Sequence, residues 1–324
     1  MGMVDTPDVT VLIINYKKPD LCIDCINSLR EHTQNVSYET LVIDNNSNDN
    51  VETLLKEHFG QEVKFFGSKT NLGTVRAYNL GRTFAHGRYL FLLNSDTQFI
   101  NNAILQMRDF LDKNEKTAMV GANLYHPDMT QAHSYKKYYS LRTIRKECRL
   151  PFLIHFALSK NKRNFDFNNS GVPTQVMYVC AAAAMIRKSA LDQIGWFSED
   201  RFMYGEEPDI AEAFRQIGYN VFNVPDAKLI HFEGASGSEK IFSFSKTSFL
   251  FSLQGNGAFF RKWTGENGQR IYYHCLKKEL KNKELLSFFS AHRALFQKYR
   301  SMRKVLSSYL KDKNAIDSQI LSIR

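Results

Sequence analysis

Four short apolar runs in the first hundred residues constrain the fold of this chain more than any other feature. The runs are rich in β-branched and aromatic residues, and the intervals between them show the apolar spacing that is typical of helices. The expected elements are strands at residues 9–14, 38–43, 63–66 and 89–93, with helices at residues 21–30, 51–58 and 71–87. Because right-handed connections place successive strands in parallel, the sequence predicts an α/β fold with a doubly wound, mostly parallel central sheet flanked by helices.

All four runs end in polar residues, which are Asn15, Asp44, Gly67-Ser68 and the Asn-Ser-Asp of residues 94–96. Since the carboxyl ends of parallel strands meet at one edge of a sheet, these endings predict a polar crevice the size of a nucleotide. The last ending follows a run with the composition of a strand buried on both faces, and it delivers Asp96. Asp96 is therefore a candidate metal or phosphate ligand, and an Asx turn after the strand is the alternative.

Missing glycine motifs argue against two common classes of nucleotide-binding protein. No G-x-G-x-x-G follows the first expected strand, and the chain contains no G-x-x-x-x-G-K-[ST]. These absences argue against a dinucleotide-binding Rossmann domain and a P-loop NTPase. A nucleotide would instead be held by side chains at the strand ends, with or without a metal ion.

Length, composition and cysteine usage limit the domain organisation and the compartment. The 324 residues are 43% hydrophobic, enough for one large domain with an extension or for two domains. No apolar run approaches the about 20 residues of a transmembrane helix, and the first residues lack the features of a signal peptide. The five cysteines suggest no disulfide set, and we expect the C-x-x-C of Cys22 and Cys25 to be buried helix positions, not a redox or zinc site. A reducing, cytoplasmic compartment fits this cysteine usage.

The net charge of +10 suggests a polyanionic partner, and nucleic acid, anionic lipid and a diphosphate substrate would each fit. Basic residues concentrate in the helical region after residue 245, where residues 261–311 hold 13 Lys and Arg against three acidic residues. These helices either pack as an ordinary amphipathic tail or dock on anionic lipid at the inner face of the cell membrane. No nucleic-acid-binding motif accompanies the charge, so nucleic acid is not expected as a partner.

The middle of the chain is less regular. A helix at residues 101–113 and a strand at residues 118–122 are expected, followed by residues 126–173, a weakly periodic segment rich in aromatic and basic side chains. This segment is either a substrate-binding insertion or a solvated loop. An apolar run at residues 175–187 then predicts another strand.

Two further candidate sites follow. A helix from Pro208 gathers Glu206, Glu207 and Asp209 at its N-terminus, where these acids either stabilise the helix dipole or include a catalytic carboxylate. A last strand within residues 221–232, broken at the proline of position 225, delivers His231. A single histidine at a strand end is more often structural than a ligand.

In this order, the motifs resemble those of glycosyltransferase family 2 enzymes with a GT-A fold, particularly the bacterial rhamnosyltransferase-like branch. The matching stretches are VTVLIINY, LVIDNNSND, NLGTVRAYNLG, YLFLLNSDT, IRKSALDQIGWFSEDRFMYGEEPDI and AKLIHFEGAS, which together span roughly residues 8–240. The resemblance implies a GT-A domain at residues 1–245, with residues 126–173 as an acceptor-side insertion. Residues 246–324 would form a basic, mainly helical C-terminal extension.

The resemblance also implies roles for individual residues. Those lining the nucleotide base and ribose would be Asn15, Tyr16, Asp44 and Ser47. Those beside the ribose and diphosphate would be Asn71, Gly73, Arg76 and Asn79. The D-x-D motif of the family falls on Asn94, Ser95 and Asp96. Asp96 and His231 would bind a divalent metal, Mn²⁺ or Mg²⁺, and the acid pair of the family falls on Glu206 and Glu207, with Glu207 as the candidate base.

Two positions depart from the family pattern. Asn94 stands where the first carboxylate of the D-x-D motif would be, which lowers the expected metal affinity. Glu207 stands where the acid pair usually has Asp, so its carboxylate reaches one methylene further.

The resemblance implies an inverting transferase that moves a sugar from a UDP- or dTDP-sugar to a hydroxyl of a glycan or lipid-linked acceptor, in cell-surface polysaccharide synthesis of a bacterial cell envelope. In this reaction a metal ion neutralises the leaving diphosphate and a carboxylate accepts the proton of the acceptor. Two other hypotheses stay open: a non-catalytic nucleotide-sugar or glycan-binding protein on the same fold, and an adaptor that acts through its basic tail. Association into a homo-oligomer is also open.

Overall fold

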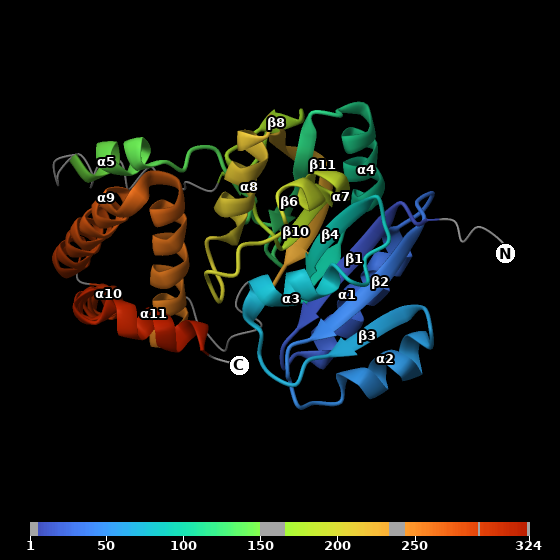
Figure 1. The fold of residues 1–324 in the computed structure, drawn as a ribbon, viewed down its shortest axis with the longest axis horizontal. Helices are drawn as coiled ribbons and strands as arrows, with labels where there is room; N and C mark the ends of the chain where they lie inside the picture. Colours follow the sequence, from blue (N-terminus) through green and yellow to red (C-terminus); the bar gives the residue numbers. More distant parts are fainter. Residues whose placement is uncertain (1–5, 150–165, 233–243, 291, 323–324) are drawn as a thin grey trace. The chain divides into compact units, whose positions relative to one another are not determined.

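The computed structural model describes residues 6–149, 166–232, 244–290 and 292–322 (Figure 1). Contacts divide the chain into two units. The first consists of Met1–Lys137, Phe165–Phe197 and Glu207–Ser236, and the second of Tyr138–Asn164, Ser198–Glu206 and Gly237–Arg324. Residues 150–165 of the expected 126–173 insertion lie outside the described residues.

The first hundred residues alternate between strands and helices as the sequence predicts. The elements are β1 (Val9–Asn15), α1 (Pro19–His32), β2 (Tyr38–Asp44), α2 (Val51–Phe59), β3 (Val63–Gly67), α3 (Gly73–Gly81) and β4 (Tyr89–Asn94). Helix α3 is shorter than expected, because it ends at Gly81 instead of near residue 87. The backbone N–H groups of Phe84 and Ala85 both donate to the Gly81 carbonyl, so a tight turn replaces the last expected helical turn.

The remaining elements of the first unit differ more from the prediction. They are β5 (Thr97–Phe99), α4 (Ala103–Lys113), β6 (Thr117–Tyr125), β7 (Tyr135–Lys136), β8 (Thr174–Gln175), β9 (Tyr178–Val179), β10 (Ala183–Arg187), α7 (Lys188–Gln193), α8 (Glu206–Gln216) and β11 (Asn220–His231). The single strand expected at residues 175–187 is wrong, because β8 pairs with β11, β9 with β7, and β10 with β4 and β6. Strand β11 continues through Pro225, where a register shift between Val224 and Lys228 absorbs the proline.

The central sheet has the strand order β3-β2-β1-β4-β10-β6-β11-β5, with β8 pairing with β11 outside this path. Strands β1 to β4 are parallel, and so are β6 and β11, while β10 and β5 run antiparallel to their neighbours. The prediction of a mostly parallel sheet is therefore confirmed. The chain places β2 and β3 on one side of β1 and β4 on the other, so β1 and β4 flank a topological switch point.

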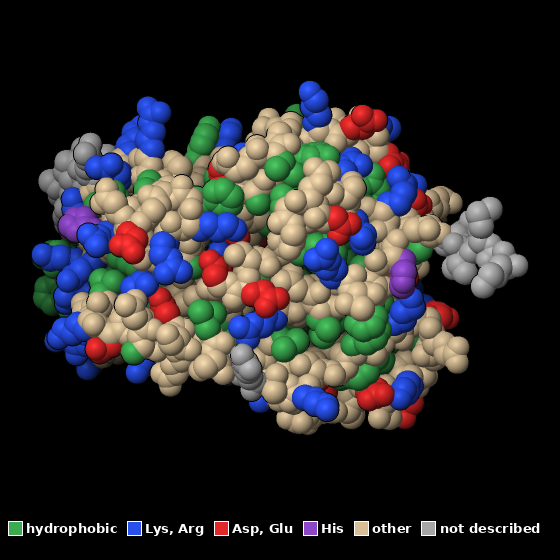
Figure 2. Space-filling model, viewed as in Figure 1, with side chains coloured by type: hydrophobic (Ala, Val, Ile, Leu, Met, Phe, Trp, Pro, Cys, Tyr) green, Lys and Arg blue, Asp and Glu red, His purple; other side chains and the backbone are tan. Residues whose placement is uncertain are grey.

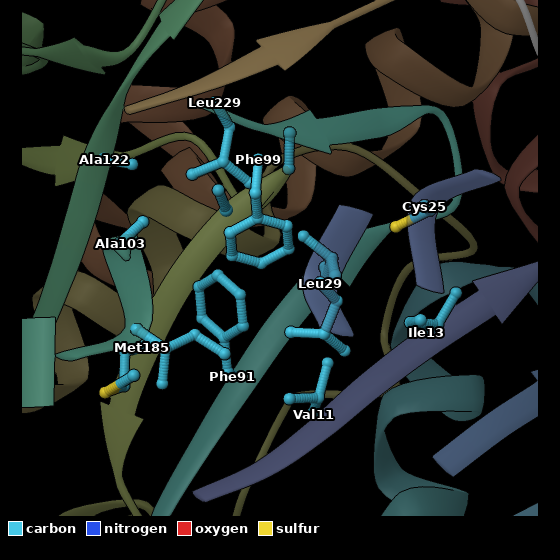
Figure 3. Close-up of a cluster of buried hydrophobic side chains, with 14 of the residues drawn as sticks. Val11, Ile13, Cys25, Leu29, Phe91, Phe99, Ala103, Ala122, Met185 and Leu229 are labelled. Atoms are coloured by element: carbon cyan, nitrogen blue, oxygen red, sulfur yellow. The ribbon is translucent and has the colours of Figure 1, made fainter. Parts of the chain in front are cut away.

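Helices cover both faces of this sheet (Figure 1). On one face, side chains of α1, α2 and α4 pack against the sheet. Figure 3 shows the part of this core around Phe91 and Phe99, with Leu29 of α1 and Met185 of β10. Side chains of α3, α7 and α8 form the core on the other face. Cys22 and Cys25 of α1 are both fully buried in the first of these clusters, which confirms that the C-x-x-C occupies buried helix positions.

A hydrogen-bond network ties the amino ends of the four parallel strands together. One carboxylate oxygen of Glu39 in β2 accepts from Thr10 Oγ1 in β1 at 2.6 Å and from the backbone N–H of His86 at 2.7 Å. The other lies 2.8 Å from Lys64 Nζ in β3 and 3.2 Å from His86 Nδ1. The backbone N–H of Gly87, just before β4, donates to Thr10 Oγ1 at 2.8 Å. The sheet is therefore held in register at the edge opposite to the predicted crevice.

The second unit is helical. It contains α5 (Leu141–Arg149), α9 (Lys246–Phe289), α10 (Arg293–Lys311) and α11 (Lys313–Leu321). Helix α9 is interrupted at Gly265, whose φ of 72° and ψ of 179° are accessible to glycine. Hydrogen bonds join the two arms, from Gln269 Nε2 to the Gly257 carbonyl at 2.8 Å and from Tyr273 Oη to the Leu253 carbonyl at 3.0 Å. Among the described helices, none has the length and apolar composition that crossing a bilayer requires.

Candidate active site

The carboxyl ends of β1 and β2 form the first polar cluster. Asn15 and Asp44 are register partners, and Asn15 Nδ2 donates to Asp44 Oδ1 at 2.9 Å and to Ser47 Oγ at 3.2 Å. The Ser47 backbone N–H donates to Asp44 Oδ2 at 2.9 Å, and its hydroxyl donates to Asp44 Oδ1. Asn46 and Asn48 adopt left-handed φ values of 62° and 53°, which asparagine tolerates and which allow the loop to turn back over Asp44.

This cluster retains one unused acceptor. Asn15 is fully buried, and its Oδ1 has no hydrogen-bond partner among the described residues. A buried carbonyl oxygen without a donor is costly unless a ligand supplies one. The cluster therefore has an acceptor to which the donor group of a ligand could bind.

Asn45 connects this cluster to α3, although the sequence analysis did not select it. The Leu72 backbone N–H donates to Asn45 Oδ1 at 2.6 Å, and Asn45 Nδ2 donates to the Gly73 carbonyl at 3.3 Å. The Gly73 N–H donates to Asn71 Oδ1 at 2.9 Å, and Gly73 has a left-handed φ of 69°. The signal for Asn45 was its place directly after a strand end, next to Asp44. Asn71 and Gly73 are thus positioned at the start of α3 by the loop after β2.

The second polar cluster lies at the end of β4. His231 Nε2 is 3.3 Å from Asp96 Oδ1 and 3.4 Å from Asn94 Nδ2. The two strands involved explain this proximity, because β5 follows Asp96 directly and its Thr97 is the antiparallel register partner of His231. The Phe232 backbone N–H also donates to the Asp96 carbonyl at 2.9 Å. The structure therefore brings together three residues that the sequence analysis assigned to the metal and diphosphate.

The groups of this second cluster fit a weakly held divalent cation. The carboxylate oxygen of Asp96 and the imidazole nitrogen of His231 lie within the distance that one ion could bridge, and their side chains are only 5% and 12% exposed. Among the described residues, no group of three or more His, Cys, Asp or Glu side chains could hold a metal. In many metal sites, the second ring nitrogen of the histidine donates a hydrogen bond that fixes the tautomer. His231 Nδ1 is buried and has no such partner in the described part of the chain. An ion held by these two groups would need further ligands, for which oxygen atoms are suited.

Buried groups beneath this cluster support the turn after β4. Thr97 Oγ1 donates to the Asn94 carbonyl at 2.8 Å, and Cys25 Sγ lies 3.6 Å from the same oxygen. Burial raises the pKa of the Cys25 thiol to about 12, so the thiol stays protonated. Ser95 is buried within the turn. These contacts fix the backbone that presents Asp96.

Other predicted site residues lie on neighbouring elements. Tyr16 follows β1 and is 38% exposed, and Arg76 is half-buried on α3. Asn79, also on α3, uses its amide to donate to the Phe197 carbonyl at 2.9 Å and to accept from the Phe197 N–H at 3.1 Å. Asn79 thus also anchors the loop after α7.

The predicted acid pair opens helix α8, with Glu206 buried and Glu207 half-buried. The turn before it belongs to the second unit, where Gly205 has a φ of 80° and a Cβ there would lie 2.8 Å from the Gly255 carbonyl oxygen. The buried Arg201 donates to the Gly205 carbonyl at 2.6 Å and pairs with Asp200 at 2.8 Å. Only glycine fits such a turn, so the start of α8 is closely fixed in the chain.

The fold is that of GT-A glycosyltransferases. Two solved structures are similar to this chain, each at 15% sequence identity. One is a mannosyltransferase of Pyrobaculum calidifontis in complex with GDP-Man and Mn²⁺. Its TM-score is 0.58, and the match covers 96% of this chain and 88% of that chain. The other, GalNAc-T7 with UDP, GalNAc and Mn²⁺, has a TM-score of 0.60 and covers 96% of this chain and 58% of that chain. At this identity the likeness shows the fold alone, and it confirms the expected GT-A architecture.

The chain belongs to glycosyl transferase family 2, because the model of that family matches residues 10–195. An uncharacterized glycosyltransferase of Methanocaldococcus jannaschii is 23% identical over 131 residues, which are 40% of this chain and 45% of that protein. The O-antigen biosynthesis protein RfbC of Myxococcus xanthus is 21% identical over 268 residues, or 82% of this chain and 20% of that protein. An N-acetylglucosaminyl-diphospho-decaprenol L-rhamnosyltransferase of Mycobacterium tuberculosis is 23% identical over 108 residues, or 31% of this chain and 35% of that protein. The chain thus spans less than half the length of each of these relatives.

Proposed function

We propose that this chain is an inverting, metal-dependent glycosyltransferase that uses a nucleoside diphosphate sugar, such as a UDP- or dTDP-sugar. The observation that carries the proposal is the pairing of Asp96 with His231 at 3.3 Å, at the strand edge that also holds the cluster of Asn15 and Asp44. Metal-bound and nucleotide-bound structures with the same fold support it.

Each cluster has a role in this proposal. The cluster of Asn15, Asp44 and Ser47 binds the base and ribose through its amide and carboxylate groups. Asp96 and His231 would hold a divalent cation, Mn²⁺ or Mg²⁺, with oxygen atoms as its preferred further ligands. When bound, this ion neutralises the charge that develops on the departing diphosphate.

Glu207 is proposed as the general base. The acceptor hydroxyl oxygen forms a bond to C1 of the sugar, the bond between C1 and the diphosphate oxygen breaks, and its electron pair leaves with the nucleotide. The hydroxyl proton passes to Glu207, and one displacement inverts the anomeric centre. Relatives named for O-antigen biosynthesis and for a diphospho-decaprenol substrate support a glycan or lipid-linked acceptor and a role in cell-surface polysaccharide synthesis.

The metal assignment can be tested by calorimetry with UDP, dTDP and GDP, with and without Mn²⁺. We expect Mn²⁺ to strengthen the binding of at least one nucleotide, and Asp96→Ala to remove that gain, at least about tenfold in affinity. Asp128→Ala is the matched control, because Asp128 is an exposed carboxylate of the same unit in the turn after β6. Unchanged metal-dependent binding in Asp96→Ala would contradict the assignment.

The base assignment needs a separate experiment. Glu207→Gln should bind the nucleotide diphosphate as the unchanged protein does but release almost no nucleotide when donor and acceptor are both present. The neighbouring variant Glu206→Gln should reduce this release less. Turnover near that of the unchanged protein in Glu207→Gln would rule out Glu207 as the base.

A second candidate function is a non-catalytic nucleotide-sugar or glycan-binding protein. Asn94 in place of a carboxylate is the observation that favours it, because the described residues then offer only Asp96 and His231 as metal ligands at this strand end. Binding of a nucleotide sugar without transfer or slow hydrolysis, across a screen of donors, would support this alternative.

We also propose a peripheral contact with anionic lipid through the basic C-terminal helices. The support is the basic composition of residues 261–311, which contain 13 Lys and Arg but only three acidic residues. A lipid-linked acceptor would be presented at such a surface.

A further inference from the structure

Two adjacent phenylalanines at the end of α9 are unusually exposed. Phe288 is 63% and Phe289 is 75% exposed, and no other phenylalanine among the described residues belongs to the exposed class. Contact between such apolar rings and water is unfavourable in proportion to the exposed apolar area. Neighbouring exposed rings therefore point to a surface that another phase or molecule covers.

The two rings belong to one helical face. Lys281, Leu285, Phe288 and Phe289 follow the spacing i, i+4, i+7 and i+8, which places them on the same side of α9. Leu285 is 38% exposed, and Lys281 is exposed as well. The last two turns of α9 thus present an apolar surface with a cation one turn behind it.

Helix α10 extends this surface. The Phe296 ring lies 5.8 Å from the Phe288 ring, and the Arg300 guanidinium lies 5.9 Å from the Phe296 centroid. Arg293 precedes Phe296 by one turn on the same face of α10 and is exposed. We call the surface formed by Leu285, Phe288, Phe289 and Phe296 the aromatic tip.

The surroundings of the aromatic tip are strongly basic. Residues 281–304 contain seven Lys and Arg and a single acidic residue, Glu284. Glu284 is already paired with Arg303, whose Nε lies 2.6 Å from its carboxylate. Figure 2 shows many Lys and Arg side chains over the part of the molecule that α9 and α10 build. The aromatic tip therefore has a cationic rim.

We propose that the aromatic tip is an interfacial anchor that docks on an anionic lipid bilayer. The phenylalanine rings enter the boundary between headgroups and acyl chains, and the cationic rim lies at the lipid phosphates. This inference deepens the proposed lipid contact by naming its docking surface. A second copy of the chain fits less well, because a symmetric contact through the aromatic tip would bring two cationic rims together.

Flotation with vesicles tests the proposal. The unchanged protein should bind vesicles that contain phosphatidylglycerol, bind vesicles of phosphatidylcholine alone much less, and dissociate as salt is raised. The double variant Phe288→Ser, Phe289→Ser should bind at least roughly tenfold more weakly, because two apolar rings no longer enter the bilayer. Tyr138→Ser is the matched control, because Tyr138 is an aromatic side chain of the same unit, 69% exposed, outside the aromatic tip.

A direct readout complements this comparison. Phe289→Trp should show a blue-shifted fluorescence maximum when phosphatidylglycerol vesicles are added. Unchanged vesicle binding in the double variant, or the same loss in Tyr138→Ser, would overturn the proposal. A second result would also overturn the proposal. In it, the unchanged protein binds no vesicles and is a dimer by size exclusion, and the double variant is a monomer.

The outcome is separable from the proposed function. The double variant should still bind nucleoside diphosphate with Mn²⁺, because Phe288 and Phe289 belong to the second unit and the nucleotide clusters to the first. Loss of vesicle binding with retained nucleotide binding supports the aromatic tip as the anchor. Vesicle binding by an unchanged protein that binds no nucleotide would contradict the proposed function and leave the anchor supported.

Discussion

The substitution Glu39→Gln should destabilise the first unit at neutral pH and have much less effect in acid. Burial alone would raise the pKa of this carboxyl, but hydrogen bonds from Lys64, Thr10 and His86 outweigh burial and lower the pKa from 4.5 to about 2. Glutamine keeps the size and one acceptor oxygen of the side chain but loses the charge. The variant therefore isolates the electrostatic part of the network at the amino ends of the strands.

The pKa difference gives the size of the effect. The lowering corresponds to roughly 3 kcal/mol of stabilisation by the charged form. Because Lys64 and His86 are 47% and 61% exposed, solvent screening reduces their contribution, and we expect a loss of about 1–2 kcal/mol in the free energy of unfolding. Since the pKa is lower in the folded state, this stabilisation is complete above about pH 4.5 and declines as the pH falls toward about 2.

Urea unfolding at pH 7, 5 and 3 would measure this loss. The chain has two tryptophans, so a Trp263→Phe background leaves Trp196 as a fluorescent reporter of the first unit. The cost of Glu39→Gln should be equal at pH 7 and 5 and fall to about half or less at pH 3. Glu52→Gln is the control, because the exposed pair of Glu52 and Lys56 should contribute only a few tenths of a kcal/mol. A cost that is the same at pH 3 and pH 7 would refute the reasoning.

Three further outcomes follow from buried contacts. Gly87→Ala should lower the free energy of unfolding by more than about 3 kcal/mol or prevent folding, because a Cβ would lie 2.4 Å from the Thr10 backbone nitrogen. A melting temperature close to that of the unchanged protein would contradict this. Cys25 should resist a thiol reagent at pH 8 until guanidinium unfolds the chain, and equal labelling rates before and after unfolding would argue against its burial. Glu284→Gln should lower the stability of the second unit by about 1–2 kcal/mol in urea, because it removes the charge opposite Arg303, and no change would show that the pair is solvent-screened.

Local sequence pattern was sufficient to predict much of the first unit. The strands from β1 to β4 are short apolar runs whose pattern is complete within a few residues, and their ends agree with the prediction to within one residue. The run at residues 175–187 has an equally apolar composition but becomes three strands. Its division depends on which distant strand each part meets, and this is a tertiary property that the composition of the run does not contain.

The candidate site shows the same division. Asp44 and Asp96 could be selected from sequence because each directly follows a buried strand. The contact between Asp96 and His231 could not be derived from spacing, because it depends on β5, a three-residue strand that was not predicted, and on its antiparallel pairing with β11. Asn45 was missed for a related reason, since its contacts with Leu72 and Gly73 appear only when α3 is placed.

The pairing of β5 with β11 also has a consequence for how the protein is made. Asn94 and His231 are 137 positions apart, so a ribosome that has released β1 to β4 has not yet produced the histidine. At about 5–20 residues per second, the histidine emerges roughly 7 to 30 seconds after Asn94. A nascent chain can pair β1 to β4 during this interval, but β5 can pair with β11 only once β11 has been synthesised. The contact between Asp96 and His231 therefore forms only in a chain that has been synthesised past β11.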